Sequence, residues 1–445
     1  MLSPLVAVFR TPELRKKIFF VLGILVLYRL GATLPSPGVN FAVVQDCLKP
    51  SGSDKSATAE QIYSLINMFS GGALLQLSVF AIGIMPYITA SIIVQLLTVV
   101  IPRFEELRKE GQAGQAKMTQ YTRYLTVALA VLQATGIVAL AANGTLLQGQ
   151  ANCDTANILH DKSIASLTLI VLVMVAGAMV VMWFGELITE RGIGNGMSLL
   201  ISAGIVARIP AEGRMIYNDR GPFIFSLVIL AGLIIVAGVV FIEMGQRRIP
   251  VQYAKRMVGR KMYGGSSTYL PLKVNQAGVI PVIFASSLLY LPMLISNLTK
   301  GTGEAKGWQI FIDNHLVKPS DPVHIAVYFA MIIFFTYFYV AVTFNPQERA
   351  DDMKKYGGFI PGIRPGQPTA DYLGYVLSRI TLPGSIYLGV IAILPNLFMD
   401  VGGGNGAQNL PFGGTALLIM VVVALDTVKQ VNSQLMQRKY EGFLN

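Results

Sequence analysis

The chain has 445 residues, of which 53% are apolar and only 13% are charged. A water-soluble protein of this length needs more polar surface than this composition provides, so we exclude soluble enzymes and soluble binding domains and take lipid as the solvent. Most of the formal net charge of +11 comes from Lys and Arg beside the apolar segments, where membrane proteins carry them.

Ten apolar segments are predicted to cross the membrane, because a span needs about 20 apolar residues to cover roughly 30 Å of hydrocarbon. In chain order they are residues 18–34, 78–101, 124–142, 165–184, 197–209, 223–242, 276–298, 323–344, 380–398 and 412–431. The first span lacks a small-residue cleavage site, so we expect it to stay in the mature chain and not to be removed as a signal peptide.

The loops between these spans differ in charge. Most of the 35 Lys and Arg residues lie near the two ends of the chain and in every second loop. Because basic residues beside spans stay in the cytoplasm, we expect a multi-pass protein of the cell inner (cytoplasmic) membrane with both termini in the cytoplasm. The two cysteines, Cys47 and Cys153, fall in outside loops, where a disulfide could join them.

A short apolar stretch precedes the second span. Residues 62–69 are too few to cross, end in Ser70-Gly71-Gly72, and lead into a span that is interrupted at Gly83 and Pro86. This pattern is typical of a re-entrant helix, because irregular backbone at membrane depth is tolerated only where it lines a cavity. The alternative is an interfacial helix that lies on the membrane surface without a gating role.

Two cytoplasmic loops, residues 243–275 and 345–378, are too long for simple helix connections. The first is dense in Arg and Lys, and the second is rich in Pro and Gly. Anionic lipid headgroups would attract such loops. Phosphate-rich RNA or an acidic protein partner explains their length and charge density better.

The middles of the spans are almost free of ionisable side chains. We expect Arg29 to snorkel toward a span end, Asp426 to meet a neighbouring Lys such as Lys429, and Glu186 and Glu190 to pair beside Arg191. Ion-coupled transporters usually keep an ionisable group near the midplane. The sequence therefore disfavours a secondary transporter of small solutes, although carriers share inverted repeats and broken spans.

Enzymatic motifs are also missing from the sequence. The three histidines, His160, His315 and His324, lie in outside loops or at a span edge, and neither H-E-x-x-H nor a G-x-x-x-x-G-K-[ST] phosphate loop occurs. We therefore expect no enzyme activity, no cofactor and no metal site.

Ordered sequence blocks between Arg15 and the C-terminal tail match a known membrane-protein family. They are Asn67-Met-Phe-Ser-Gly-Gly72, Gly83-Ile-Met-Pro-Tyr-Ile-Thr-Ala-Ser91, Gln120-Tyr-Thr-Arg-Tyr124, Ile188-Thr-Glu-Arg-Gly-Ile-Gly-Asn-Gly196, Gly245-Gln-Arg-Arg248, Leu270-Pro-Leu-Lys-Val-Asn275, Gly278-Val-Ile-Pro281 and Phe359-Ile-Pro-Gly-Ile-Arg-Pro-Gly366. With these blocks the chain resembles the SecY family, the central subunit of the bacterial protein-conducting channel.

The resemblance implies an all-α polytopic membrane protein. Its ten transmembrane helices would form two inverted five-helix halves, residues 1–211 and 212–445, around a central pore. The re-entrant segment 62–72 would plug the outer funnel. Its plug residues are Ile62, Tyr63, Leu65, Ile66, Asn67, Met68, Phe69, Ser70, Gly71 and Gly72.

The resemblance also implies an apolar constriction in the pore. By motif position its ring falls on Ile84, Ile88, Met197, Ile201, Ile283 and Ile419. Met197 departs from the isoleucine that is common in relatives. An apolar constriction suits an unfolded polypeptide, because it binds every kind of side chain weakly and dewets when no chain occupies it.

A lateral gate between the second and seventh spans would release transmembrane segments sideways into lipid. Polar contacts along or near this seam would come from Thr89, Ser91, Gln95 and Asn275. Such contacts between helices are weak, so an apolar signal helix could open the seam.

The function implied is a protein-conducting channel of the general secretory pathway. Its partners would be SecE-like and SecG-like small membrane subunits, the SecA motor ATPase, the ribosome, signal sequences, nascent polypeptides and membrane lipids. The SecA motor and ribosomal RNA would dock on a set of basic residues, namely Arg247, Arg248, Arg256, Arg260, Lys261 and Arg364. An insertase-type scaffold without a continuous pore remains the competing interpretation beside the transporter.

Overall fold

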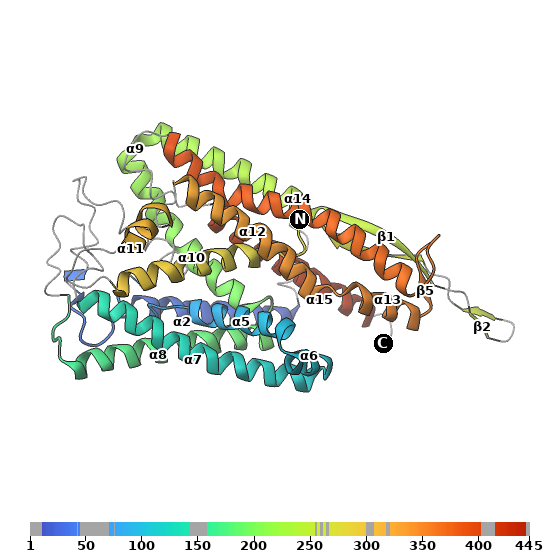
Figure 1. Cartoon of the computed structure of the whole chain (residues 1–445), viewed down its shortest axis with the longest axis horizontal. Coiled ribbons are helices and arrows are strands. Elements are labelled where there is room, and N and C mark those ends of the chain that lie inside the picture. Colours follow the sequence, from blue (N-terminus) through green and yellow to red (C-terminus); the bar gives the residue numbers. More distant parts are fainter. Residues whose placement is uncertain are drawn as a thin grey trace.

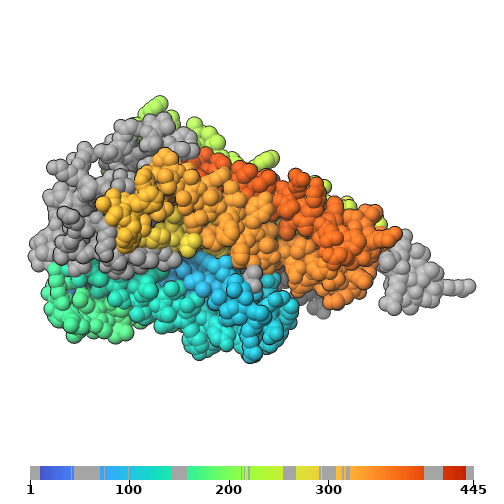
Figure 2. Space-filling view, viewed as in Figure 1, coloured from blue at the N-terminus to red at the C-terminus, as the bar shows by residue number. Residues whose placement is uncertain are grey.

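The computed structural model describes residues 11–41, 43–44, 71–74, 76–142, 158–253, 256–258, 261–263, 267–299, 307–316, 321–401 and 414–441. Its helices run side by side along the long axis, and a narrow β hairpin projects from one end (Figure 1). The space-filling view shows two stacked layers, with the earlier part of the chain below and the later part above (Figure 2).

The lower layer contains the early helices, and a long helix connects it to the upper layer. These elements are α2 (Pro12–Thr33), α5 (Met85–Val100), α6 (Pro102–Lys109), α7 (Gln112–Ala142), α8 (Ile164–Arg191) and α9 (Gly196–Met244). The upper layer contains α10 (Ile280–Thr299), α11 (Gly307–Phe311), the π-helix η2 (Ile312–Leu316), α12 (Pro322–Thr343), α13 (Pro346–Lys355), α14 (Gln367–Val401) and α15 (Gly414–Glu441).

Several helix starts are fixed by the local sequence. The side chains of Ser163, Asn195, Asp321 and Asn345 accept hydrogen bonds from N–H groups in the first turns of α8, α9, α12 and α13. These N–H groups have no partner within their own helix, so a side-chain oxygen at this position stabilises each start.

The long helix α9 differs from the sequence prediction. It contains both the fifth and the sixth predicted spans, and the loop expected between them is also helical. Only Gly221, with φ 79° and ψ 172°, leaves helical geometry, and Pro222 follows it. Glycine adopts positive φ without strain and proline prevents continuous helical bonding, so the two residues break α9 into two spans without a long loop.

By length and apolar composition, six helices among the described residues could cross a membrane, or seven if α5 and α6, which are bent by 97°, count as one span. The remaining predicted spans fall on α2, the first part of α9, and α10. The ten predicted segments thus coincide largely with helices, and the chain is a polytopic α-helical membrane protein. Residues 78–84, expected within the second span, form turns instead.

The two long loops contain strands that the all-α prediction did not include. β1 (Gln246–Tyr253) pairs antiparallel with β4 (Ser267–Lys273) on one edge and with β5 (Gly358–Phe359) on the other. β2 (Arg256–Val258) and β3 (Lys261–Tyr263) form a separate hairpin. Ile249 and Val251 are buried on one face of β1 while their neighbours are exposed, which is the alternation expected of a half-buried strand.

The loops predicted to be cytoplasmic gather at one end of the molecule. Leu14 of α2 and Ile193 of the α8–α9 loop pack with Val431 and Leu435 of α15. The β1–β4 sheet lies at the same end, because Lys273 at the end of β4 forms an ion pair with Asp426 of α15 (3.3 Å). We refer to this part of the molecule as the basic end.

The turn segment 76–84 is packed closely against two helices. Phe80 stacks on the buried ring of Tyr28 (6.2 Å between centroids) and touches Phe184 edge to face. Phe80 lies so near Gly31 of α2 that a β-carbon at Gly31 would collide with its ring, and the Val79 carbonyl likewise leaves no room at Gly177 of α8. Both glycines are therefore required for the close approach of this segment.

We predict that Gly31→Ala destabilises the protein by about 2 kcal/mol, because overpacking a filled site typically costs 1–3 kcal/mol. Gly23→Ala is the matched control, since nothing lies within 4 Å of a β-carbon at Gly23 on the same helix. Thermal unfolding in detergent measures both variants. Equal stability of the two would contradict the packing described for Phe80.

Candidate functional site

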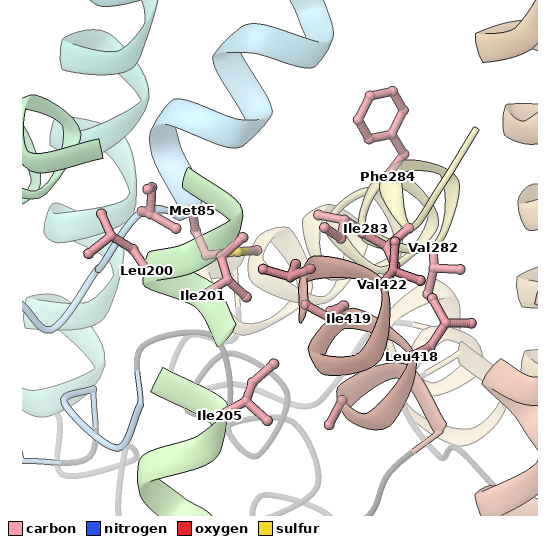
Figure 3. Packing of buried hydrophobic residues seen from close by; sticks show 14 of the residues in the cluster. Met85, Leu200, Ile201, Ile205, Val282, Ile283, Phe284, Leu418, Ile419 and Val422 are labelled. Carbon is pink, nitrogen blue, oxygen red and sulfur yellow. The ribbon is translucent and has the colours of Figure 1, made fainter. Parts of the chain in front are cut away.

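Four of the six predicted ring residues lie in one buried apolar cluster. Ile84 at the start of α5, Ile201 of α9, Ile283 of α10 and Ile419 of α15 have exposed fractions of 1%, 2%, 6% and 1%. Figure 3 shows Ile201, Ile283 and Ile419 directed toward one another from three different helices. Both layers thus contribute to a single apolar junction.

The other two predicted ring residues, Ile88 and Met197, are half-buried and pack against the same cluster. Gly185 of α8 has no room for a β-carbon because the sulfur of Met197 occupies that space. Met197 therefore packs between α8 and α9, one turn before Ile201. A flexible thioether fills such an irregular gap without a branched side chain.

The sequence prediction did not include other members of this cluster. Met85, Ile205, Leu418 and Val422 are buried beside the predicted ring residues (Figure 3). Ile205 follows Ile201 by four residues, so helical periodicity alone places both on one face of α9. We call these buried residues and the predicted ring residues the apolar collar, and aliphatic side chains of this kind line hydrophobic constrictions in channels.

Most of the predicted plug, from Ile62 to Ser70, lies outside the described residues. Gly71 and Gly72 are described, and both have positive φ (66° and 94°), which favours glycine. The Gly71 carbonyl accepts a hydrogen bond from Arg29 Nη1 of α2 at 3.0 Å. The sequence predicts only snorkelling for Arg29, and its contact with this segment was missed.

The α9 backbone also lies against Gly71. A β-carbon at Gly71 would meet Arg29 Nη1 at 2.8 Å and the Cα of Gly204 at 3.0 Å. The last residues of the predicted plug segment are therefore held between α2 and α9. Gly204 lies on the same helix as Ile201, so this contact is close along the chain to the apolar collar.

The predicted lateral-gate residues fall in two places. On α5, Thr89 Oγ1 donates to the Met85 carbonyl (3.0 Å) and Gln95 Nε2 donates to Ser91 Oγ (3.5 Å). Both hydrogen bonds lie within α5, and this helix contacts α10. Asn275 precedes α10, and its hydrogen-bond partners are Glu243 of α9 and Gly278 in the chain before α10.

Asn275 is buried beside the carboxylate of Glu243. Its amide donates to Glu243 Oε1 at the end of α9 and to the Gly278 carbonyl (3.1 Å) before α10. Both side chains are at least 95% buried, so this bond replaces the water that the carboxylate would otherwise bind. The sequence prediction missed Glu243, although its acidic side chain directly before a basic loop was a signal of an internal partner.

Two predicted ion pairs are wrong in their partners. Glu186 pairs across helices with Arg123 of α7 through two bonds (3.0 and 2.7 Å), not beside Arg191. Asp426 pairs with Lys273 and not with Lys429. In both cases the true partner is distant in sequence, and the packing of helices brings it closer than the neighbour on the same helix.

The predicted docking residues are exposed where their side chains are described. Arg247 and Arg248 lie on β1, and Arg364 lies in a turn where Gly362 and Gly366 have positive φ. The Arg364 carbonyl accepts from Thr369 Oγ1 (2.8 Å), which fixes the turn to the start of α14. Arg256 and Lys261 lie on β2 and β3, and Arg260 is outside the described residues.

The remaining polar groups form structural contacts. His315 Nδ1 lies 3.2 Å from Asp321 Oδ2. The hydrogen bond from the Val323 N–H is the largest cause of the lowered pKa of the Asp321 carboxyl, and the His315 side chain lowers this pKa further. In the described part of the chain, no group of three His, Cys, Asp or Glu side chains is arranged to hold a metal ion. Cys47 and Cys153 both lie outside the described residues.

The sequence matches a family model described as SecY over residues 78–428. The chain is 70% identical to the protein translocase subunit SecY of Mycobacterium tuberculosis and 60% identical to that of Corynebacterium glutamicum, with all of each chain covered. The matched region includes the predicted ring residues, the predicted lateral-gate residues and the two long loops.

Solved structures share the fold at lower identity. One described as "The structure of a protein conducting channel" has a TM-score of 0.59 and 20% identity, covering 93% of this chain and 91% of that chain. Sec61 in the canine ribosome–channel complex has a TM-score of 0.56 and 19% identity over the same shares. At this identity the likeness concerns the fold.

We predict that Asn275→Leu destabilises the protein by about 2 kcal/mol, because it leaves the buried Glu243 carboxylate without its donor. The double variant Asn275→Leu with Glu243→Met is the control, since removing both partners of a buried polar pair costs much less. Unfolding in detergent is the measurement. A single variant as stable as the double variant would refute this role of Asn275.

Proposed function

This chain belongs to the SecY family, and we propose that it forms the protein-conducting channel of the general secretory pathway. It passes unfolded polypeptides across the cytoplasmic membrane and releases transmembrane segments sideways into lipid. The observation that best supports this function is the apolar collar, to which α5, α9, α10 and α15 each contribute an isoleucine.

The chemistry of the collar suits a substrate of variable sequence. A translocating chain presents charged, polar and apolar side chains in turn, and a charged constriction would hold some of them too tightly. Aliphatic side chains bind each of them weakly and leave no hydrogen-bonding site for water when the pore is empty. The same residues therefore serve as a seal and as a low-friction passage.

The plug completes the seal in this proposal. Segment 62–72 fills the outer funnel, and the contacts of Gly71 with Arg29 and Gly204 fix its end next to α9. Displacement of the plug would break the charge-assisted hydrogen bond from Arg29 to Gly71. Such a bond is strong enough to favour the closed state and weak enough to yield to a binding event.

Lateral release uses the seam between α5 and α10. These helices belong to different layers and are in contact, while Thr89 and Gln95 donate hydrogen bonds to groups within α5. Separation of the helices at this place therefore breaks apolar packing and leaves these side-chain bonds intact. An apolar signal sequence or the membrane lipids can replace that packing.

The three-stranded sheet at the basic end is the proposed docking surface for the ribosome and the SecA motor. β5 pairs with β1 through Gln252 and Phe359, so the sheet unites the two long loops, and exposed Arg247, Arg248 and Arg364 lie on them. Guanidinium groups bind the phosphates of ribosomal RNA and acidic side chains of proteins well. The canine Sec61 relative is described in a ribosome–channel complex, which supports the ribosome as a partner.

Location and assembly follow from the same proposal. The chain resides in the cell inner membrane with both termini in the cytoplasm, and the gathering of the predicted cytoplasmic loops at the basic end supports this orientation. SecE-like and SecG-like subunits complete the complex, with exposed apolar faces such as that of Gly221–Met244 available to lipid or subunits.

We predict that deletion of residues 62–72 opens the channel to ions, because it removes the seal on the outer side. Single-channel conductance in planar bilayers, with the small subunits present, is the measurement. Deletion of residues 49–59, of equal length and in the same loop, is the control and should leave the channel silent.

If neither deletion produces conductance and both variants are shown to be folded and inserted, the result would argue against a plugged pore. It would favour an insertase-type scaffold, which has no continuous pore to unseal. A conductance that appears after both deletions would assign the effect to the length of the loop and not to the plug.

We predict that Arg364→Glu reduces motor-driven export by about tenfold or more, because charge reversal places like charges against an acidic partner. Arg349→Glu, which is also exposed and lies on nearby α13, is the control for net charge. ATP-dependent transport into vesicles measures export, and the thermal unfolding temperature should stay unchanged in both variants. Normal export by the Arg364 variant would remove this residue from the docking surface.

A further inference from the structure

The two layers are joined at the basic end by two sets of contacts. One is broad and largely apolar, since Leu14 and Ile193 pack with Val431 and Leu435, and the Gly194 N–H donates to Gln430 Oε1 (2.8 Å). The other set lies where α6 faces α12 and α13, and it includes an electrostatic interaction of Lys109 with Glu348. Arg108 Nη1 donates to the Val342 carbonyl at 2.9 Å, across 234 residues of sequence.

Arg108 is fixed to the lower layer. Its neighbour Leu107 is buried in a cluster with Val94 of α5 and Met118 of α7. The Leu107 carbonyl lies so close to Gly114 of α7 that a β-carbon would not fit there. α6 therefore moves together with α5 and α7, and Arg108 is carried with them.

Val342 is fixed to the upper layer. Val340 and Phe344, which lie on either side of it in α12 and its cap, are buried with Ile249 of β1 and Leu373 of α14. The end of α12 thus moves with the docking sheet and with α14. A separation of α5 from α10 at the proposed lateral gate must then lengthen the distance from Arg108 to Val342.

The Val342 carbonyl needs a donor from outside its helix. The residue four positions later is Pro346, which has no N–H, so continuation of the helix could not satisfy this carbonyl. The end of a helix also carries partial negative charge. A guanidinium group supplies both a hydrogen-bond donor and a positive charge. A hydrogen bond from a charged donor is also stronger than one between neutral groups.

Neighbouring basic residues are placed differently. Lys109 pairs with Glu105 on α6 itself (2.8 Å), and Lys117 pairs with Glu110 (3.6 Å). Arg108 is therefore the residue of this basic segment that reaches across to α12. Since its side chain is exposed, its loss leaves no cavity in the core.

We propose that Arg108 is a latch that holds the cytoplasmic end of the lateral gate closed, and so sets how apolar a signal sequence must be to open it. This inference rests on the proposed channel function. The closed state contains the bond to Val342 and the open state lacks it. A ligand that opens the gate must supply this difference in free energy, so removing the bond lowers the threshold.

Distances between spin labels test the latch without any transport. In a parent carrying Cys47→Ser and Cys153→Ser, labels are attached at Glu106→Cys on α6 and Gln347→Cys on α13, both at exposed positions. The full chain is studied in lipid nanodiscs with its small subunits. Arg108→Gln is compared with Arg103→Gln, which removes the same charge from an exposed position on the same helix.

Arg108→Gln should raise the ratio of separated to closed molecules about fivefold, since an exposed charge-assisted hydrogen bond is worth roughly 1 kcal/mol. Arg103→Gln should leave the distance distribution of the parent unchanged. Identical distributions for Arg108→Gln and the parent would overturn the proposal. A similar shift in both variants would also overturn it, because it would assign the effect to net charge.

Transport of a client with a shortened apolar signal core is the second readout. Arg108→Gln should export it about fivefold faster than the parent does, while a client with a full-length core should gain little because its signal already opens the gate. Failure of every variant to export any client would refute the channel function. The label distances would still decide whether Arg108 holds the two layers together.

Discussion

Hydrocarbon offers no hydrogen-bond partner, so each polar backbone group at membrane depth must find one inside the protein. The turn segment 76–84 meets this constraint without a regular helix. The Ser36 N–H donates to the Leu77 carbonyl and the Val79 N–H to the Leu34 carbonyl, and the glycines of α2 and α8 let aromatic rings close over them. This segment ends at Ile84, so the position of one side of the collar depends on these bonds.

Two polar contacts among the described residues hold neighbouring elements of the fold together. Arg123 and Glu186 join α7 to α8, and Asn275 joins α9 to the chain that enters α10. The first pair lies within one layer, and the second links the end of α9 to the chain that leads into α10, the helix that carries Ile283.

The spans could be predicted from the sequence because their signal is local, namely apolar length and flanking charge. The ring positions Ile84, Ile201, Ile283 and Ile419 needed the family motifs, since any single isoleucine in a span is indistinguishable from a packing residue. The partners of Glu186 and Asp426 could not be predicted, because Arg123 and Lys273 lie on other elements and no sequence spacing relates them. The strands could have been predicted, because the alternation of Ile249 and Val251 is visible in the sequence. The basic residues around this pattern obscured it.

The pairing of β5 with β1 has a consequence for the order of biosynthesis. β1 and β4 are close in sequence and can pair as soon as residue 273 has been made, but the third strand is supplied by Gly358 and Phe359, after α10 and α12 have been synthesised. Chains are made from the N-terminus onward and local units fold first. The three-stranded sheet is thus completed only after α12 and α13 and before α14 and α15, so a half-made chain has an unfinished edge strand. The same strand pairing that shapes the mature surface distinguishes a finished molecule from a nascent one.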